Sequence, residues 1–95
     1  MRVTPSNIIY NDLIGLRVNV LSSTDSTLVG VSGTVIDETA NMLVVSQDGK
    51  SARKMIPKRI SRFSFLLPEQ EQVFVEGADI SFSPEERLKR LQRRH

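Results

Sequence analysis

Cysteine and tryptophan are absent from this sequence of 95 residues, and histidine occurs once, as His95. Without cysteine the chain can form no disulfide, carries no reactive thiol and offers no thiolate ligand to zinc. A lone histidine cannot complete a catalytic triad or a metal site, because both need several converging side chains. These absences exclude the commonest thiol, triad and zinc chemistries.

Long apolar runs are also missing from the sequence. No stretch approaches the about 20 consecutive apolar residues that a membrane-spanning helix needs. The first five residues carry one charge, at Arg2, with no apolar segment behind it, so we expect no signal peptide. An apolar content of 39% is typical of a folded domain. We therefore expect a soluble, cytoplasmic protein of one domain without a membrane partner.

The net charge is only +2, but the charged residues are unevenly distributed. Residues 50–62 contain bases and no acid, residues 63–86 contain acids and no base, and residues 87–95 are basic again. Two acid-free basic clusters concentrate positive potential, which favours a polyanionic ligand such as a nucleic acid. The alternative is that these lysines and arginines only solvate a hairpin and a helix.

Alternation of apolar and polar residues predicts short β-strands through the middle of the chain. The predicted strands cover residues 16–20, 29–35, 42–47, 50–56, 62–67 and 72–76. Gly30 and Gly33 inside the second strand predict a sharp bend or a bulge. Asp48-Gly49 between two strands predicts a two-residue type I′ hairpin turn. Asp37 and Glu38 are interpreted as part of a turn.

The two ends of the chain carry signals for helices. Thr4 and Pro5 predict the start of a short helix that ends near Gly15. Ser83, Pro84 and Glu86 form a capping box, so a basic helix is expected over residues 83–95. The fold class is mainly all-β, a small antiparallel barrel of about six strands with a helix at each end.

Catalytic motifs are not found. Asp37 and Glu38 are neighbours in extended chain, so their side chains point apart and cannot converge as an acid–base pair. Gly30 and Gly33 lack the Gly-Lys-Ser/Thr ending of a phosphate-binding loop. A binding function is better supported, with phosphate contacts through the basic residues. The phenylalanines Phe63, Phe65 and Phe74 have the spacing of core residues, which favours structured RNA over a base-stacking surface.

The candidate RNA contacts come from both basic clusters. Lys50 and Lys54 should share one face of a strand, with Arg53 on the other. The full set is Arg17, Lys50, Arg53, Lys54, Lys58, Arg59, Arg62, Arg87, Lys89, Arg90, Arg93 and Arg94.

The chain resembles the archaeal ribonuclease P protein component 1 family, whose members fold as Sm-like barrels. The resemblance rests on Asp12–Leu16, Leu28–Thr39, Asn41–Val45, Ile56–Lys58, Phe63–Phe65 and Pro84–Lys89. It implies an N-terminal extension over residues 1–15, a barrel over 16–80 and a basic C-terminal helix over 81–95.

The resemblance also implies a function. Family members assemble with a catalytic RNA, a zinc-ribbon subunit and other small proteins to remove the 5′ leader from precursor tRNA. The RNA and its Mg²⁺ ions perform the hydrolysis, and zinc belongs to the partner subunit, so no cofactor or metal is expected in this chain. The resemblance places Ile8, Ile9 and Leu13 at the partner surface. The alternative is that these residues close the bottom of the barrel.

Two other functions stay open at this point. One is a free-standing Sm-like RNA chaperone that works as a ring, although helices at both ends would cover the strand edges that such a ring pairs through. We expect a monomer when the chain is isolated. The other is a protein–protein adaptor in which the basic residues only solvate the surface.

Overall fold

The computed structural model describes residues 3–92, with side chains described as far as residue 89. Six antiparallel strands form one sheet in the order β4-β3-β2-β1-β5-β6. The strands are β1 (Arg17–Ser23), β2 (Ser32–Glu38), β3 (Met42–Gln47), β4 (Arg53–Pro57), β5 (Ser61–Leu66) and β6 (Gln72–Glu76). Three 3₁₀ turns, η1 (Ile8–Tyr10), η2 (Ser26–Leu28) and η3 (Gly77–Ile80), and one helix, α1 (Pro84–Gln92), complete the fold. The predicted mainly-β fold is confirmed.

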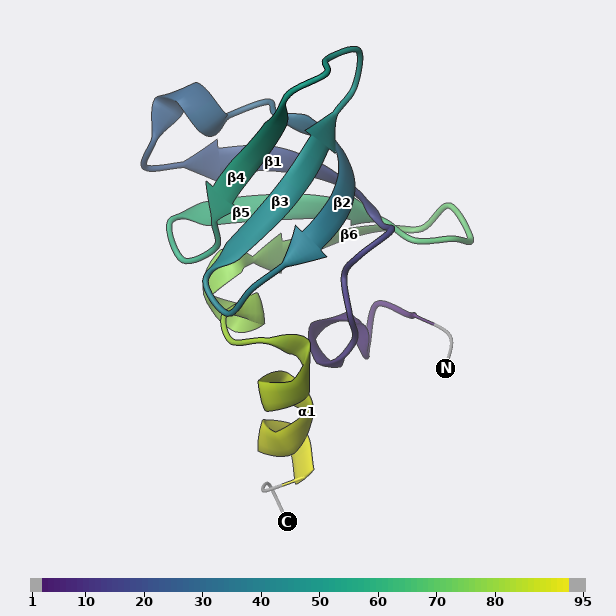
Figure 1. Ribbon diagram of the computed structural model, residues 1–95. Coiled ribbons are helices and arrows are strands. Elements are labelled where there is room, and N and C mark those ends of the chain that lie inside the picture. Colours follow the sequence, from purple (N-terminus) through teal and green to yellow (C-terminus); the bar gives the residue numbers. More distant parts are fainter. Residues whose placement is uncertain (1–2, 93–95) are drawn as a thin grey trace.

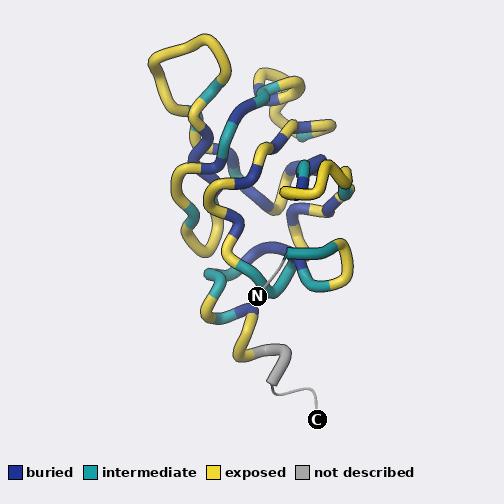
Figure 2. The backbone as a smooth tube through the Cα atoms, turned by 90° about the vertical axis from the view of Figure 1, so that its right-hand side faces the viewer, coloured by how far each residue is buried: buried dark blue, intermediate teal, exposed yellow. Residues whose placement is uncertain are grey.

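The sheet bends over on itself to make a barrel-like body. In Figure 1, β2, β3 and β4 run diagonally across the front, and β1, β5 and β6 cross behind them. The inward residues of both layers form one apolar core, and the 3₁₀ turns add to it. Its fully buried members include Val35, Leu43, Val45, Ile56, Phe63, Phe65 and Ile80. Figure 2 shows many buried positions along the strands, whereas the tips of the long loops are exposed.

Two bulges give the sheet its local bends. One lies in β1 between Val20 and Ser22, and the other lies in β2 between Val35 and Asp37. Neither falls at Gly30 or Gly33, where the sequence predicted a bend or a bulge. Gly33 instead marks a close approach of two strands, since a Cβ there would lie 2.0 Å from the Ser46 carbonyl oxygen.

The type I′ turn predicted at Asp48-Gly49 is wrong. Strand β3 ends at Gln47 and β4 begins only at Arg53. Gly49 has a positive φ of 70°, but Asp48 does not, and a type I′ turn requires both. A turn does form across these two residues, because the Lys50 N–H donates to the Gln47 carbonyl at 3.3 Å, but it is not of type I′. The Asp48 N–H donates to the Ser32 carbonyl at 3.1 Å, which keeps Asp48 attached to β2.

The N-terminal helix predicted from Thr4 to Gly15 is also wrong, because only the 3₁₀ turn Ile8–Tyr10 forms. The Asn11 amide donates to the Asn7 carbonyl at 2.8 Å, so a side chain competes for the backbone group that a helix would use. Ile8 and Leu13 are buried in the core with the strands. They close the barrel, which was the alternative, and their predicted role in a partner surface is corrected. Ile9 is partly buried against the same core.

The C-terminal helix begins as predicted. Pro84 is its first residue, and the Ser83 hydroxyl accepts a hydrogen bond from the Glu86 N–H at 3.2 Å. Helix α1 lies beside the N-terminal segment below the barrel (Figure 1). Within residues 3–92, no helix is long and apolar enough to cross a membrane.

Candidate nucleic-acid interface

A buried cluster of charges joins the barrel to α1. The Lys58 ammonium donates to Glu38 Oε2 at 2.7 Å, and Arg87 Nη1 donates to the same oxygen at 2.7 Å. The side chains of Glu38 and Lys58 are 0% exposed and that of Arg87 is 3% exposed. We call these three residues the buried charge cluster.

The bulge in β2 explains why Glu38 reaches the interior. Val35 pairs with Val45, but Asp37 pairs with Val44 and Glu38 with Leu43, so the alternation shifts by one residue. Glu38 therefore lies opposite the fully buried Leu43, and its neighbour Asp37 is exposed. The prediction that Asp37 and Glu38 belong to a turn is wrong, because β2 extends through both residues.

Arg87 uses its whole guanidinium inside the protein. Nε donates to the Ile9 carbonyl at 2.6 Å, and Nη2 donates to the Asn11 carbonyl at 2.7 Å. Nη1 also donates to the carbonyls of Ile80 at 2.9 Å and Phe82 at 2.7 Å. One side chain of α1 thus holds the N-terminal segment and the residues after η3 against the barrel.

The Lys58 ammonium also has all its hydrogen-bond partners inside the protein. Besides Glu38, its ammonium donates to the carbonyls of Thr39 at 2.7 Å and Phe82 at 3.2 Å. Burial lowers the pKa of Lys58 from its ordinary value, although Glu38 opposes the shift. Lys58 and Arg87 offer no surface to a ligand, so their predicted RNA contacts are corrected.

The exposed cations lie elsewhere, above all around the β3–β4 hairpin. Lys50 lies before β4, so the prediction that it shares a strand face with Lys54 is wrong, but both residues line one groove. Arg53 pairs with Ser46 and Lys54 pairs with Val45, so the two neighbours point to opposite faces of β4. Within residues 3–92, no hydrogen bond or ion pair engages the side chains of Lys50 or Arg53.

Three other residues that were predicted to contact RNA are exposed, but their side chains already interact with other residues of the chain. Arg17 makes two hydrogen bonds to the Asp48 carboxylate, at 2.7 and 2.6 Å, and this pairing lowers the pKa of Asp48. Arg62 lies 2.9 Å from a carboxylate oxygen of Glu76. The Arg59 guanidinium lies 5.9 Å from the ring centre of Phe82. A phosphate would have to compete with these neighbours.

On α1, Lys89 is exposed. The Arg90 side chain and residues Arg93 and Arg94 lie outside the part of the chain that the structure describes. RNA contacts through these four residues stay a prediction.

Phe74 was predicted to lie in the core, but the structure places it at the surface. Its side chain is 69% exposed, whereas Phe63 and Phe65 are fully buried as predicted. Val73 and Val75 take the inward positions of β6, so alternation places Phe74 outward. Counting Phe74 with the core residues is therefore wrong.

Among the described residues, no group of three or more His, Cys, Asp or Glu side chains could hold a metal ion. The acidic Glu38 is engaged in the buried charge cluster. What the surface offers is unpaired positive charge, which attracts anions such as phosphates. The fold and the site define a small antiparallel β-barrel with a cationic surface, a class that includes many RNA-binding proteins.

Comparison with known proteins identifies the family. The sequence profile described as ribonuclease P/MRP, subunit p29, matches residues 6–90. The chain belongs to this family.

Individual relatives agree with this assignment. The ribonuclease P protein component 1 of Staphylothermus marinus is 41% identical over 98% of this chain and all of its own length. That of Methanosphaera stadtmanae is 40% identical over 93% of this chain and 92% of its own. Among solved structures, Mth11, described as a homologue of human RNase P protein Rpp29, superposes with a TM-score of 0.60 at 36% identity. The superposition covers 79% of this chain and 96% of Mth11.

Proposed function

We propose that this chain is a non-catalytic, RNA-binding subunit of ribonuclease P that supports the catalytic RNA in removing the 5′ leader from precursor tRNA. The observation that carries the proposal is the family match over residues 6–90. In this proposal the RNA and its Mg²⁺ ions break the phosphodiester bond. A zinc-ribbon subunit is a partner and holds the zinc.

The charge distribution supports an RNA-binding role without catalysis. Lys50, Arg53 and Lys89 are exposed, and Lys54 is half-buried at the wall of a groove. Cations of this kind neutralise phosphates and so help an RNA to fold compactly, whereas hydrolysis needs converging carboxylates or metal ligands. The charged groups that do converge, in the buried charge cluster, are shielded from any substrate.

Reconstitution tests the proposed function. The chain is added to ribonuclease P RNA and the zinc-ribbon subunit, and cleavage of precursor tRNA is measured at limiting Mg²⁺. We expect faster cleavage with the chain than without it, and no cleavage by the chain alone. Cleavage by the chain without RNA, or no effect of the chain on the RNA, would contradict the proposal.

Salt dependence tests the cationic surface. The variant Lys50→Ala/Arg53→Ala/Lys54→Ala should bind ribonuclease P RNA more weakly, and its log–log salt slope should fall by about one for each phosphate that is no longer neutralised. Lys58 is left intact, because its removal would disturb the buried charge cluster. Arg62 is also left intact, because it is paired with Glu76. An unchanged slope would show that the hairpin cations do not bind RNA, as an adaptor function would require.

A further inference from the structure

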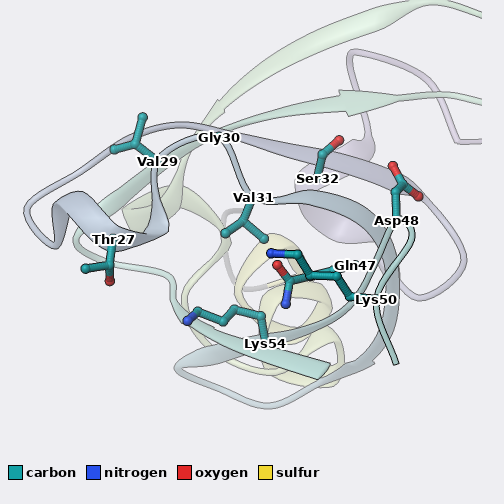
Figure 3. Close-up of a pocket in the computed structure, with 9 residues that line it drawn as sticks. All are labelled: Thr27, Val29, Gly30, Val31, Ser32, Gln47, Asp48, Lys50 and Lys54. Atoms are coloured by element: carbon teal, nitrogen blue, oxygen red, sulfur yellow. The ribbon is translucent and has the colours of Figure 1, made fainter. Parts of the chain in front are cut away.

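A groove opens between the β3–β4 hairpin and the segment that follows η2. Its volume is about 370 Å³, near the lower end of the about 300–1,000 Å³ typical of small-molecule sites. Figure 3 shows Val29, Gly30, Val31 and Ser32 along one wall, and Gln47, Lys50 and Lys54 along the other. These residues come from two segments that the sheet brings together through the pairing of β2 with β3.

The groove keeps positive charge, because its two lysines outnumber the one acid that lines it. Lys50 and Lys54 direct their amines into it, one beside the Gln47 amide and the other toward Thr27 (Figure 3). Asp48 is at the rim, but both of its carboxylate oxygens are bound by Arg17. Asp25 lies outside the groove but near enough to Lys54 for that charge to lower its pKa, so it offsets part of the Lys54 charge and leaves Lys50 unopposed; Thr27 holds the Asp25 carboxylate through its N–H and hydroxyl.

The groove also contains an amide and apolar side chains, which a site for phosphate alone would not need. The Val31 side chain points inward beside the Gln47 amide (Figure 3), and Val29 is 49% exposed. An apolar surface next to an amide suits a flat ring with a polar edge, because the amide can both donate and accept hydrogen bonds. The two amines suit the phosphate attached to such a ring.

We propose that this groove binds a single unpaired nucleotide of an RNA, with Lys50 and Lys54 on its phosphate and with Gln47 and Val31 against its base. The inference rests on the proposed function and adds a recognition element to it. Unpaired nucleotides can be turned out of a helix and enter a pocket, whereas the stacked bases of a duplex cannot. An acidic peptide would satisfy the two amines but would leave the Val31 surface and the Gln47 amide without a matching partner.

Amide chemical shifts of the full-length chain test the groove directly. The ligands are a single-stranded RNA hexamer of mixed sequence, a blunt RNA duplex without unpaired nucleotides, and a pentaglutamate peptide. We expect the hexamer to shift the amides of Val31, Gln47 and Lys50, and the other two ligands to shift Val31 and Gln47 much less. Equal shifts by the duplex, larger shifts by the peptide, or no shift at these amides would overturn the inference.

Affinity for ribonuclease P RNA gives a second, independent test. We expect Lys50→Ala/Lys54→Ala to weaken binding by about ten- to a hundredfold and Gln47→Ala by about fivefold, the latter without a change in salt slope. The control Arg53→Ala/Lys89→Ala removes the same charge outside the groove and should reduce affinity less than the groove pair does. Thermal melts check that each variant folds.

The two proposals fail in different ways. If the wild-type chain binds ribonuclease P RNA but the groove pair and the control pair reduce affinity equally, only the groove inference is wrong. If the wild-type chain does not bind this RNA at all, the proposed function is wrong.

Discussion

The β3–β4 hairpin and the buried charge cluster both contain lysine and arginine, but the hairpin exposes these side chains to solvent and the cluster buries them. Lys50, Arg53 and Lys54 keep their charges at the surface, whereas Lys58, four residues further on, is fully buried with Glu38 and Arg87. Charge in water is available to a ligand, and charge in the interior must be satisfied by fixed partners. A basic run in a sequence can therefore contain both residues that bind a ligand at the surface and residues that stabilise the fold from the interior.

Removal of Glu38 is expected to have the largest effect on stability. Glu38→Gln leaves two cations buried without an anion, and breaking a buried pair typically costs about 3–5 kcal/mol. The measurement is the free energy of unfolding in urea. Glu76→Gln is the control, because Glu76 is paired with Arg62 at the surface, where such pairs contribute about 0–1 kcal/mol. Equal decreases for the two variants would contradict the contrast between interior and surface.

Arg87→Ala is expected to have the second-largest effect on stability. It leaves Glu38 paired with Lys58 but removes the Arg87 donor from the backbone carbonyls of Ile9, Asn11 and Ile80. The Phe82 carbonyl loses one of two donors and keeps Lys58. Unsatisfied buried acceptors cost about 1–3 kcal/mol each unless water reaches them, so we expect a destabilisation of about 3 kcal/mol. Amide exchange should accelerate in α1 and around Ile8–Tyr10 more than in β3. Arg87→Lys should restore only part of the protection, since an ammonium cannot span these acceptors. Lys89→Ala, an exposed neighbour, should change neither quantity.

Lys58→Met should have the smallest effect of the three. Glu38 keeps Arg87 as its partner and an apolar side chain of similar length fills the space, but the Thr39 carbonyl loses its Lys58 donor, so we expect a destabilisation of about 1–2 kcal/mol. The pH dependence sharpens this prediction. Because burial lowers the pKa of Lys58 in the folded state, the unfolded chain binds more protons as pH approaches the ordinary value of 10.5. The stability of the wild type relative to Lys58→Met should therefore rise with pH in that range, and a falling or flat difference would contradict the assigned burial effect.

Alternation and capping signals in the sequence correctly predicted those strands and helix ends that are stabilised by residues close to them in the chain. Strands β3 (Met42–Gln47) and β6 (Gln72–Glu76) have the bounds that alternation indicated, and Ser83 caps α1 as expected. The turn at Asp48-Gly49 was predicted at the right place, but its type and the start of β4 were wrong. Arg17 and Ser32, far away in the sequence, hold Asp48. The predicted N-terminal helix does not form, because burial of Ile8 and Leu13 in the barrel outweighs a weak helical signal.

The buried charge cluster could not be predicted from the sequence pattern. Its members are 20 and 49 residues apart along the chain, and no periodicity links them. The bulge that turns Glu38 inward also breaks the alternation that would have indicated its direction. The one available signal was the resemblance of Leu28–Thr39 and Pro84–Lys89 to a known family, which marks Glu38 and Arg87 as parts of shared motifs but does not say that they touch.

The long reach of Arg87 bears on how the chain acquires its structure. Its hydrogen bond to the Ile9 carbonyl joins residues 78 positions apart, and interactions of such separation form late because a large loop must close first. Since Arg87 follows every strand in the chain, a nascent polypeptide can complete the sheet, and bury Ile8 and Leu13 in it, before α1 has been synthesised. The hydrogen bonds from Arg87 to the N-terminal segment can therefore form only after every strand is available.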